Sequence, residues 1–425
     1  MHMRIPVILF ACMLSITAMG QERKIQATWY VDGAKEKYEN RSHTSLESLE
    51  QGTSVIYATN SVDLILTRLR MNKASGGVID EDRMDTGRNS ALLADCGSKV
   101  TMEFCEVVSH TPQADGVTAS GKGTRIKLEE GSVTTNRLAS KAICAIHGAD
   151  VIVHKTEVNT SGNQSPAFFA LDSGAVTVTE AFGLNAGQAS PSFYVSTGKI
   201  SADKCRMSSA KWTICSLDDG LLELTGNELK AGGICGFLVY GADRERECRS
   251  YGVLNLKKNT ITVSEGPLIL LTNSGADIYL TGNKISCKND EIISVRRDEW
   301  GTKGLNQGDG SLYLEKQTLN GDIFVDSISS LSVFLKKGAK LNGRITGDPT
   351  DRRVVKINMY KGSTWTVKGD IYVTAVSFEG LSLEKGLKQI KGKHVIYYDP
   401  DALINSHLEG KEYRTGGGVL RPMKK

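Results

Sequence analysis

Short runs in which apolar and polar residues alternate recur along most of the chain, and most of them follow a glycine. Residues 97–102, with the sequence GSKVTM, show the pattern in its simplest form. Strand side chains have a period of two, so Val100 and Met102 point to one side of an extended strand and Thr101 to the other. The glycines that open comparable runs are Gly97, Gly123, Gly148, Gly174, Gly198, Gly220, Gly252, Gly275 and Gly310. The pattern therefore predicts a series of short strands, each with one side facing a core.

The spacing of these runs is regular. Successive glycines in the series lie 26, 25, 26, 24, 22, 32, 23 and 35 residues apart. A repeat of 22–26 residues is typical of one coil of a β-solenoid, with three short strands and three turns. One coil cannot bury its apolar side alone, whereas stacked coils share a continuous core. The two longer gaps predict loops at residues 242–250 and 298–307.

The repeat predicts an all-β fold, a right-handed parallel β-helix built as a single-stranded solenoid. The helix proper is expected over residues 61–380, with caps over residues 21–60 and 381–425, where the repeat is weak or absent. Apolar pairs such as Val176 and Val178 are expected to stack in line along the core.

A β-sandwich array is the alternative to the solenoid. Its strands would be joined by hairpin turns every 8–12 residues or so, with Asn-Gly or Asp-Gly signals. Asp-Gly pairs stand at residues 32–33, 115–116, 219–220 and 309–310, which is at most one per coil. The solenoid is therefore the favoured interpretation.

The corners between strands have their own residue types. Glycine is expected there because it accepts a positive φ at no steric cost. Asn227 and Asn283 follow glycines at comparable corners. Two interpretations of these asparagines stay open: side-chain ladders between coils, or tolerance of a left-handed turn.

The N-terminus has the pattern of a secretory signal peptide. Arg4 precedes an apolar run over residues 5–18, and small residues follow, so we expect a signal over residues 1–20 with cleavage after Gly20. The run is shorter than the roughly 20 apolar residues of a membrane span. Lipidation of Cys12 is the less favoured alternative. The mature chain is therefore expected to be exported: secreted, periplasmic or at the cell surface.

Composition excludes some classes of function. The chain has 425 residues and a formal net charge of +4, from 52 Lys and Arg against 48 Asp and Glu. Nucleic-acid binding wants a concentrated basic surface, so no nucleic-acid partner is expected. After the signal, no apolar run is long enough to predict a transmembrane segment. Many glycines (44) and few prolines (8) suit strands and turns.

Eight cysteines follow the signal region, and none belongs to a CxxC pair, so no zinc site is expected. Several stand in apolar strands, where a free cysteine behaves as a small buried apolar residue. That interpretation is favoured over disulfides between neighbouring coils, which an exported protein could form. The eight are Cys96, Cys105, Cys144, Cys205, Cys215, Cys235, Cys248 and Cys287.

The C-terminal third resembles the adhesin-like right-handed β-helix proteins of the pectin-lyase-like fold, which are exported bacterial proteins. The likeness lies in residues 300–306 (WGTKGLN), 319–331 (LNGDIFVDSISSL) and 362–373 (GSTWTVKGDIYV), and in the ending at 397–399 and 410–413. Over residues 60–295 only the repeat pattern is similar. The resemblance implies the β-helix fold and a surface or adhesive role, and it supplies no catalytic residues.

Pectin-lyase-like folds also host polysaccharide enzymes, so the chain was compared with their sites. Polygalacturonase-like hydrolysis needs paired acids, with a His-Gly and an Arg-x-Lys that hold the acidic sugar. The matching pieces are residues 125–127 (RIK), 147–148 (HG) and 218–219 (DD). They occur in the reverse chain order and without the Asn-Thr-Asp element. Alternation around Ile126 explains the basic pair, so coincidence is the favoured interpretation.

The sequence indicates a metal site no more strongly than it indicates a hydrolase site. The short acidic runs at residues 80–82, 129–130 and 218–219 are each typical of a solvated turn, although calcium binding needs several converging carboxylates. His147 and His154 stand on either side of one strand and need not converge. Residues 243–247 (DRERE) are expected to form an exposed loop. No residue is therefore assigned as catalytic, cofactor-binding or metal-binding, and no cofactor is expected.

Aromatic residues fall at related places on consecutive coils. Such a stack inside a solenoid is usually core packing, which is the favoured interpretation. Residues that point outward would instead form a ladder for sugar rings. The residues are Phe168, Phe169, Phe193, Tyr194, Trp212, Phe237 and Tyr240.

These patterns predict a secreted or cell-surface adhesin-like β-helix protein that binds a glycan or a surface protein without catalysis. The alternative is a polysaccharide lyase or glycoside hydrolase on the same fold. The sequence predicts no oligomeric state.

Overall fold

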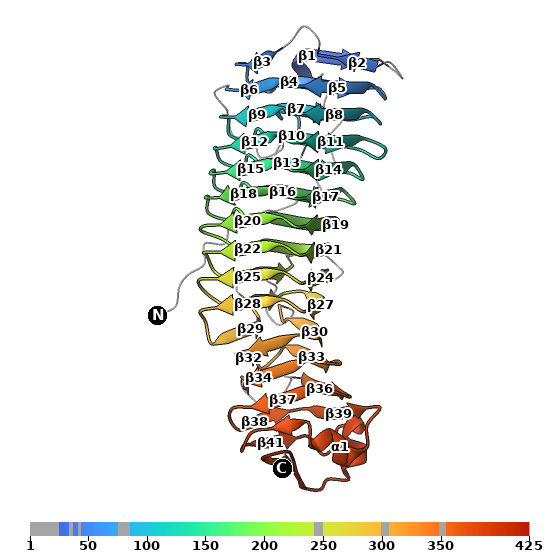
Figure 1. The fold of residues 1–425 in the computed structure, drawn as a ribbon, viewed down its shortest axis with the longest axis vertical. Helices are drawn as coiled ribbons and strands as arrows, with labels where there is room; N and C mark the ends of the chain where they lie inside the picture. The colour runs from blue at the N-terminus through green and yellow to red at the C-terminus, as the bar shows by residue number, and fades with distance from the viewer. Residues whose placement is uncertain are drawn as a thin grey trace. The chain divides into compact units, whose positions relative to one another are not determined.

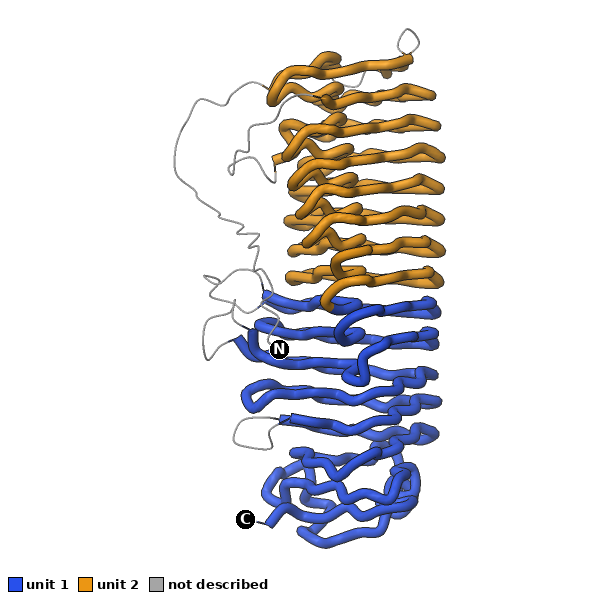
Figure 2. Tube along the Cα trace, turned by 90° about the vertical axis from the view of Figure 1, so that its left-hand side faces the viewer, with its two compact units in different colours: residues 1–7, 235–425 blue, residues 8–234 orange. Residues whose placement is uncertain are grey.

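The computed structural model describes residues 25–33, 37–40, 44–74, 86–241, 250–298, 306–347 and 354–424. Only 3% of it is helix, and its parallel stacked coils form a β-solenoid of about 14 turns (Figure 1). The predicted parallel β-helix is confirmed. The chain divides into two compact stacks of coils, called unit 2 (up to residue 234) and unit 1 (from residue 235), as coloured in Figure 2.

Each coil of unit 2 contributes one strand to each of three strand columns. The first column holds β1 (Gln26–Asp32), β4 (Thr53–Thr59), β7 (Leu92–Ala94), β10 (Val117–Ser120), β13 (Ile143–Ile146), β16 (Phe168–Leu171) and the first halves of β19 (Phe193–Asp203) and β21 (Cys215–Thr225). The second holds β2 (Lys37–Glu39), β5 (Asp63–Thr67), β8 (Lys99–Glu103), β11 (Arg125–Glu129), β14 (Asp150–His154), β17 (Ala175–Thr179) and the second halves of β19 and β21. The third holds β3 (Ser45–Ser48), β6 (Arg70–Lys73), β9 (Glu106–Ser109), β12 (Ser132–Thr135), β15 (Glu157–Thr160), β18 (Phe182–Asn185), β20 (Arg206–Ser209) and β22 (Glu228–Ala231).

Unit 1 continues the same plan in its own stack. Its first column holds β23 (Phe237–Tyr240), β26 (Ile269–Thr272), β29 (Glu291–Val295), β32 (Asp322–Val325) and β35 (Ile345–Thr346). Its second holds β24 (Tyr251–Lys257), β27 (Gly275–Thr281), β30 (Asp309–Glu315), β33 (Ser330–Leu335), β36 (Val354–Tyr360) and β39 (Ala375–Glu379). The remaining parallel strands are β25 (Thr260–Val263) with β28 (Lys284–Cys287), and β31 (Thr318–Asn320), β34 (Lys340–Gly343), β37 (Thr364–Val367) and β40 (Ile390–Lys391).

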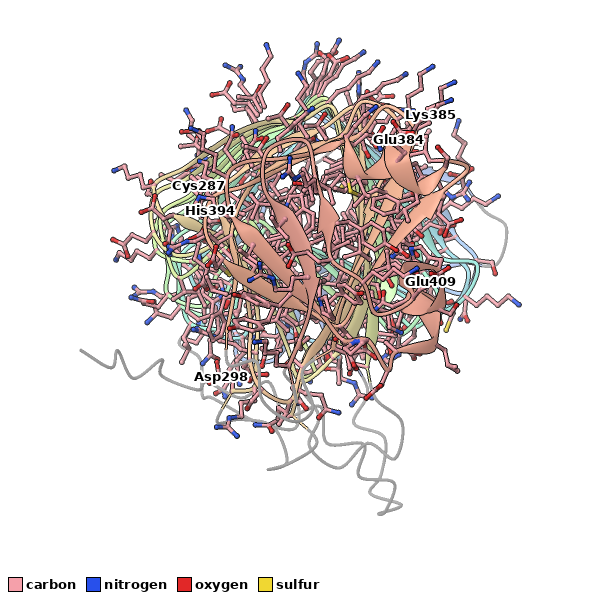
Figure 3. The ribbon with its side chains drawn as sticks, turned by 90° about the horizontal axis from the view of Figure 1, so that it is seen from below. Cys287, Asp298, Glu384, Lys385, His394 and Glu409 are labelled. Atoms are coloured by element: carbon pink, nitrogen blue, oxygen red, sulfur yellow. The ribbon has the colours of Figure 1, made fainter. Side chains whose placement is uncertain are left out.

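The C-terminal end of unit 1 adds helical turns to the stacked strands. Helix α1 (Leu383–Leu387) and the 3-10 helix η2 (Leu403–Leu408) lie beside β38 (Ile371–Val373), β41 (Val395–Tyr398), β42 (Tyr413–Arg414) and β43 (Val419–Pro422). Strands β42 and β43 pair antiparallel, whereas the pairs between described strands of successive coils are parallel. In the view from this end, Glu384, Lys385 and Glu409 lie toward the rim (Figure 3).

Strands β1, β2 and β3 pair in register with β4, β5 and β6, so these three strands stand in the same three columns as the coil that follows. Past residue 380, β41 still pairs with β38 in parallel. Most of the two expected loops, residues 242–249 and 299–305, lie outside the described residues, as do the expected signal peptide and the acidic run at 80–82.

The core follows the predicted alternation. In unit 2, Val100, Ile126 and Val151 stand in register on three successive coils, and each is 0–1% exposed. In unit 1, Leu254 and Ile278 continue the same arrangement and are fully buried. In-register parallel pairing places like side chains above one another, so each apolar position becomes a continuous row.

Within the described residues, the residue that follows most second-column strands is in the left-handed region, and it is often not glycine. Lys155, Lys204 and Lys258 hold φ of 46–56° there, while Gly226 and Gly282 hold 66° and 62° at the same corner. The left-handed conformation costs an L-residue about 1–2 kcal/mol. The lysine side chains at this corner are exposed, so the backbone takes the turn without moving a side chain into the core.

The glycines before the strands were expected to supply positive φ, and only some of them do. Gly97, Gly123, Gly148 and Gly220 have φ between 76° and 96°. Gly174 serves close approach instead, because a Cβ there would lie 2.1 Å from the Ala145 carbonyl oxygen. The sequence cannot distinguish these two needs for a glycine.

The asparagines at the corners form ladders, which decides between the two sequence interpretations. Gly226 and Gly282 take the left-handed turn, so Asn227 and Asn283 are free to bond. The Asn283 Oδ1 accepts from the Asn259 backbone N–H (2.9 Å) and side-chain Nδ2 (3.0 Å). Its Nδ2 donates to Leu256 O at 2.8 Å.

A row of polar side chains also lies inside unit 2, at the ends of the third-column strands. The hydroxyls of Ser48, Ser109 and Thr135 each donate to a backbone carbonyl five residues later, at 2.8, 2.7 and 2.5 Å. Lys73 occupies the same row, is fully buried, and donates to Glu50 O at 2.6 Å. These bonds satisfy carbonyls of the turn between the third and first columns, which would otherwise be buried without partners.

Candidate functional site

The first strand column of unit 2 is buried on both of its sides. Phe168 and Phe169 are neighbours on β16, so they point to opposite sides, yet they are 0% and 2% exposed. Phe168 stacks on Phe193 at 5.5 Å, and Phe169 stacks on Tyr194 at 5.2 Å between ring centroids. The favoured core interpretation holds for these four rings and for Phe237, whereas Trp212 and Tyr240 are half-buried.

Phe169 and Tyr194 belong to a second apolar cluster on the side of the column away from the solenoid interior. Its members are Cys144, Ile146, Phe169, Leu171 and Tyr194, and none is more than 8% exposed. Alternation along the strands places these residues opposite the rows that face the interior. The outer side of this column is therefore packed rather than open to solvent.

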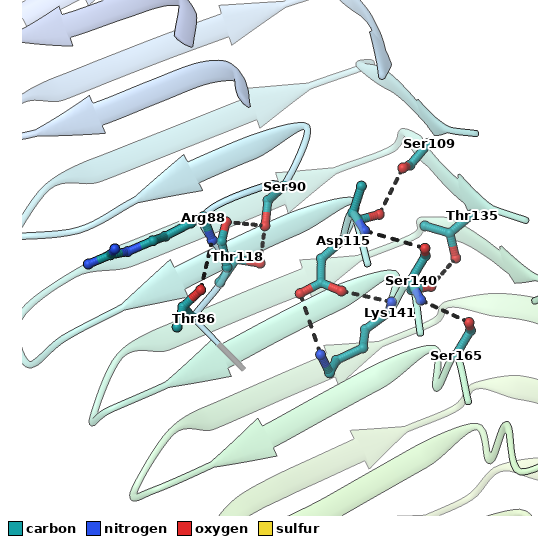
Figure 4. A network of polar contacts seen from close by, with 12 residues as sticks. Thr86, Arg88, Ser90, Ser109, Asp115, Thr118, Thr135, Ser140, Lys141 and Ser165 are labelled. Atoms are coloured by element: carbon teal, nitrogen blue, oxygen red, sulfur yellow. Dashed lines mark hydrogen bonds and ion pairs between the residues drawn. The ribbon is translucent and has the colours of Figure 1, made fainter. Parts of the chain in front are cut away.

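A buried ion pair adjoins this cluster (Figure 4). The Lys141 Nζ lies 3.7 Å from the Asp115 Oδ2, and the Lys141 backbone N–H donates to Asp115 Oδ1 at 2.8 Å. The same Nζ lies 5.0 Å from the centre of the Phe169 ring, within cation–π range. Nearby, the hydroxyls of Ser90 and Thr118 share a hydrogen bond of 2.7 Å.

Cys144, Lys141 and Asp115 are of residue types that occur in reactive sites. Their side chains are, however, as buried as those of structural residues. Burial raises the pKa of the Cys144 thiol well above its usual value, which keeps it protonated and unreactive. Lys141 and Asp115 are 1% and 5% exposed, so these side chains offer a ligand almost no surface. We assign the pair to positioning the turn before β13, since Asp115 accepts a hydrogen bond from the Lys141 backbone N–H and forms an ion pair with the Lys141 side chain.

The polygalacturonase-like pieces are not brought together. Arg125 and Lys127 project from β11 in the second column and pair with Asp150 (3.0 Å) and Glu129 (2.7 Å). Asp218 lies on the first-column half of β21, where it accepts from Ser196 Oγ at 3.3 Å. Four coils separate β11 from β21, roughly 19 Å at the usual strand spacing. The favoured interpretation of these pieces as coincidence agrees with this separation.

The histidines stand apart as well. His147 Nδ1 lies 2.8 Å from Asp172 Oδ2 on the surface, and His154 ends β14 on the other side of a strand. Among the described residues, no group of three or more His, Cys, Asp or Glu is arranged to hold a metal ion.

The cysteines within the described residues form no disulfide, which agrees with the favoured interpretation. Five are buried, Cys287 is half-buried and Cys96 is exposed. Burial raises the pKa of Cys205 to about 11 and also raises that of Cys105. Cys248 lies outside the described residues.

A partly exposed row of aromatic side chains lies on the second strand column of unit 1. Tyr279, Tyr313 and Phe334 stand in register on β27, β30 and β33, with ring centroids 4.6 Å apart and planes within 9° of parallel. Their side chains are half-buried, whereas the apolar neighbours on either side in each strand point into the core. Tyr251 on β24 is a further ring, 48% exposed, but it is in register with Gly275 and so stands four residues along the strand from this row. We call Tyr279, Tyr313 and Phe334 the aromatic strip.

Tyr251 is held in place by the residues below it. Gly275 is its partner in register, and a Cβ at Gly275 would lie 2.5 Å from the Tyr251 Cδ2, so the ring leans into space that only glycine leaves open. Burial, with the Asp277 carboxylate as the second cause, raises the pKa of Tyr251 to about 12. The phenol therefore stays protonated at neutral pH.

Polar residues flank the strip on both sides. Asp277, Ser311 and Ser332 form the row on one side, in register on the same three coils as the stacked rings. On the other side, Lys336 places its Nζ 5.2 Å from the centre of the Tyr313 ring. The strip is therefore one residue wide, with hydrogen-bonding groups along its edges.

The aromatic strip was missed in the sequence although its signal is present. Tyr279 stands between Ile278 and Leu280, and Tyr313 between Leu312 and Leu314, so alternation alone places both rings outside. Their juxtaposition follows only from the register, because 34 residues and a long insertion separate the two tyrosines.

The chain matches no known protein family, no curated protein and no solved structure. The helices within the described residues, of 5 and 6 residues, are too short to cross a bilayer.

Proposed function

We propose that the protein is an exported, adhesin-like β-helix that binds a glycan or protein ligand without transforming it. The observation that carries this proposal is the aromatic strip, an accessible row of ordered rings on a rigid sheet. Ordered aromatic side chains supply contact area at low entropic cost, which is why they dominate binding surfaces. The signal-like N-terminus supports export, and the resemblance of the C-terminal third to pectin-lyase-like adhesins supports the surface role.

The polysaccharide-enzyme alternative has no supporting arrangement among the described residues. Catalysis by paired carboxyl groups requires them to lie within roughly 5–10 Å of each other, on either side of one bond. The acidic and basic pieces that suggested an enzyme lie on different strand columns and several coils apart. The described residues therefore favour the binding function over catalysis.

The test uses the full chain on a glycan array and on immobilised extracellular-matrix proteins, with a reducing-end assay on the same glycans. We expect saturable binding on at least one surface and no release of reducing ends. The double variant Tyr279→Ala/Tyr313→Ala should lose that binding by at least about tenfold. The matched control is Tyr372→Ala/Tyr397→Ala, which removes another stacked pair (4.7 Å) from the C-terminal end. Product release, or equal binding by both variants, would overturn the proposal.

A further inference from the structure

Exposed lysines gather at one corner of unit 1, where each second-column strand turns into the strand that follows it. On five successive coils, from β24 to β36, the segments that span this corner contain eight lysines and one acidic residue, Glu315. These segments are residues 257–262, 281–286, 315–320, 336–342 and 360–366. Six of the exposed lysines form what we call the lysine row: Lys258, Lys284, Lys316, Lys337, Lys340 and Lys361.

The lysine row is continuous from coil to coil. The Lys316 backbone N–H donates to the Lys337 carbonyl oxygen at 3.0 Å, so these two residues stand on adjacent coils at the same corner. A Cβ at Gly362 would lie 3.8 Å from the Lys337 Cγ, and a Cβ at Gly282 would lie 4.0 Å from the Lys258 Cγ. The row therefore follows the stacking direction, and each coil advances it by one strand spacing, about 4.8 Å.

The lysine row differs from the same corner of unit 2 in its ion pairs. In unit 2, Lys155 lies 3.6 Å from the Glu130 carboxylate on the coil before it, and Lys204 lies 4.0 Å from Asp203. Among the described residues, by contrast, no lysine of the row lies within 4.0 Å of a carboxylate oxygen. Unit 1 therefore presents a line of like charges that its own acidic residues do not neutralise.

A line of like charges favours one kind of ligand. Like charges directly opposite each other on neighbouring strands destabilise a sheet, and a linear polyanion along the row would relieve this repulsion. A polyanion also gains from the release of its counterions when ammonium groups replace them. Each lysine is a compact charge with three donors and imposes no planar geometry, so it accepts carboxylate and sulfate groups alike.

The neighbouring aromatic strip favours a polysaccharide over a nucleic acid. Lys336 precedes Lys337 and places its Nζ 5.2 Å from the centre of the Tyr313 ring, so the strip runs beside the row. Single-stranded nucleic acids bind through bases that stack on ring faces. Both faces of Tyr313 are already covered by Tyr279 and Phe334. The tyrosine hydroxyls remain, and they can exchange hydrogen bonds with the hydroxyl groups of sugars.

We propose that the lysine row binds a linear acidic polysaccharide that lies along the stacking direction. Its carboxylate or sulfate groups contact the lysines, and its sugar hydroxyls face the aromatic strip. This inference rests on the proposed function and adds the class of ligand.

The experiment is biolayer interferometry of the full chain on immobilised heparin, alginate, neutral β-glucan and oligothymidylate, at low and at high salt. We expect binding to heparin, which carries sulfates, or to alginate, which carries only carboxylates, and a dissociation constant that rises with salt. Lys316→Gln/Lys337→Gln should raise that constant at least about tenfold and reduce its salt slope by about one for each lysine. Lys316→Arg/Lys337→Arg keeps both charges and should bind as the wild type does.

The matched control is Lys155→Gln/Lys204→Gln, which removes the same charge from the same corner of unit 2, where the lysines have acidic partners. It should change the dissociation constant by less than about twofold, as for exposed residues outside a contact surface. Equal losses in the two glutamine variants would show that net charge alone is responsible, and would overturn the inference. Circular dichroism of each variant checks that the solenoid is folded.

The remaining outcomes separate this inference from the proposed function. Tighter binding to oligothymidylate than to either acidic polysaccharide overturns the inference. If the chain binds only neutral β-glucan or matrix proteins, the inference fails while the binding function stands. If the chain binds none of these surfaces, both fail.

Discussion

At the scale of the residue, burial decides which reactive groups are available. Lys141 and Asp115 have the chemistry of a site, but they face each other across 3.7 Å with almost no exposed surface. Tyr251 has a modest chemistry, but it is 48% exposed and its ring is seated over Gly275. A binding role therefore fits Tyr251 better than the buried pair.

The buried ammonium group of Lys73 predicts that stability depends on pH. Burial lowers the pKa of its ammonium from 10.5 to about 8, so the folded state loses this proton before the unfolded state does. Below pH 8 both states carry the charge, and the folded state bears the full cost of burying it. As the pH rises from 8 to 10.5 that cost is relieved, so the contribution of Lys73 to stability increases with pH.

The comparison is urea unfolding of the wild type and of Lys73→Met across this range. The unfolding free energy of the wild type, relative to that of Lys73→Met, should rise by up to about 3 kcal/mol between pH 8 and 10.5. Other titrating groups cancel in the difference. A difference that is flat with pH would show that Lys73 keeps its ordinary pKa in the folded chain.

At the scale of the element, the corners matter more than the strands. Each strand is short, and its pairing repeats from coil to coil. At each corner, by contrast, the backbone N–H and C=O groups need hydrogen-bond partners other than the strand pairing. In unit 1 these partners are side-chain amides. The Asn283 Oδ1 accepts from the Asn259 backbone N–H at 2.9 Å, and the Asn283 backbone N–H donates to the Gln317 Oε1 at 2.7 Å. These amides satisfy buried backbone groups that the strand pairing leaves over.

Replacing Asn283 by alanine tests the ladder. The substitution leaves the Asn259 N–H and the Leu256 carbonyl buried without these partners, and each such group costs about 1–3 kcal/mol. We expect Asn283→Ala to lower the unfolding free energy by about 2–4 kcal/mol in urea titrations. Asn289→Ala, at an exposed turn position, is the control and should stay within about 0.5 kcal/mol. Equal effects of the two variants would contradict a structural ladder.

The elements were predictable to different degrees. Alternation and spacing sufficed for the coils, because rows such as Val100, Ile126 and Val151 need only a period of two and a constant repeat. Glycine positions were less informative: Gly97 supplies a positive φ, whereas Gly174 supplies room for a carbonyl oxygen. The sequence does not show which corner lysines take a positive φ, because the surrounding coil imposes this backbone conformation.

For the candidate site, the sequence predicts which single side chains point outward, but not which of them lie together. Alternation places Tyr279 outside the core, and a reader of the sequence could say so. Its contact with Tyr313 depends on which residues of two coils share a register, and insertions between coils hide that register. The support of the Tyr251 ring by Gly275 depends on packing between neighbouring coils, which no local pattern encodes.

At the scale of the whole molecule, stacking turns single residues into rows. Each coil contacts its neighbours, so one outward residue per coil becomes a line of like chemistry along a unit. A solenoid can therefore build an extended binding surface without a motif at any one position. The aromatic strip is such a surface, and the buried rows of unit 2 are its interior counterpart.

The most direct test of this account is a crystal structure of the full chain with an oligosaccharide of the acidic polysaccharide that it binds. The account predicts an intact ligand that lies along β27, β30 and β33, in contact with Tyr279 or Tyr313. A ligand seated on the first strand column of unit 2, beside Lys141 and Phe169, or a ligand that has been cleaved, would contradict it.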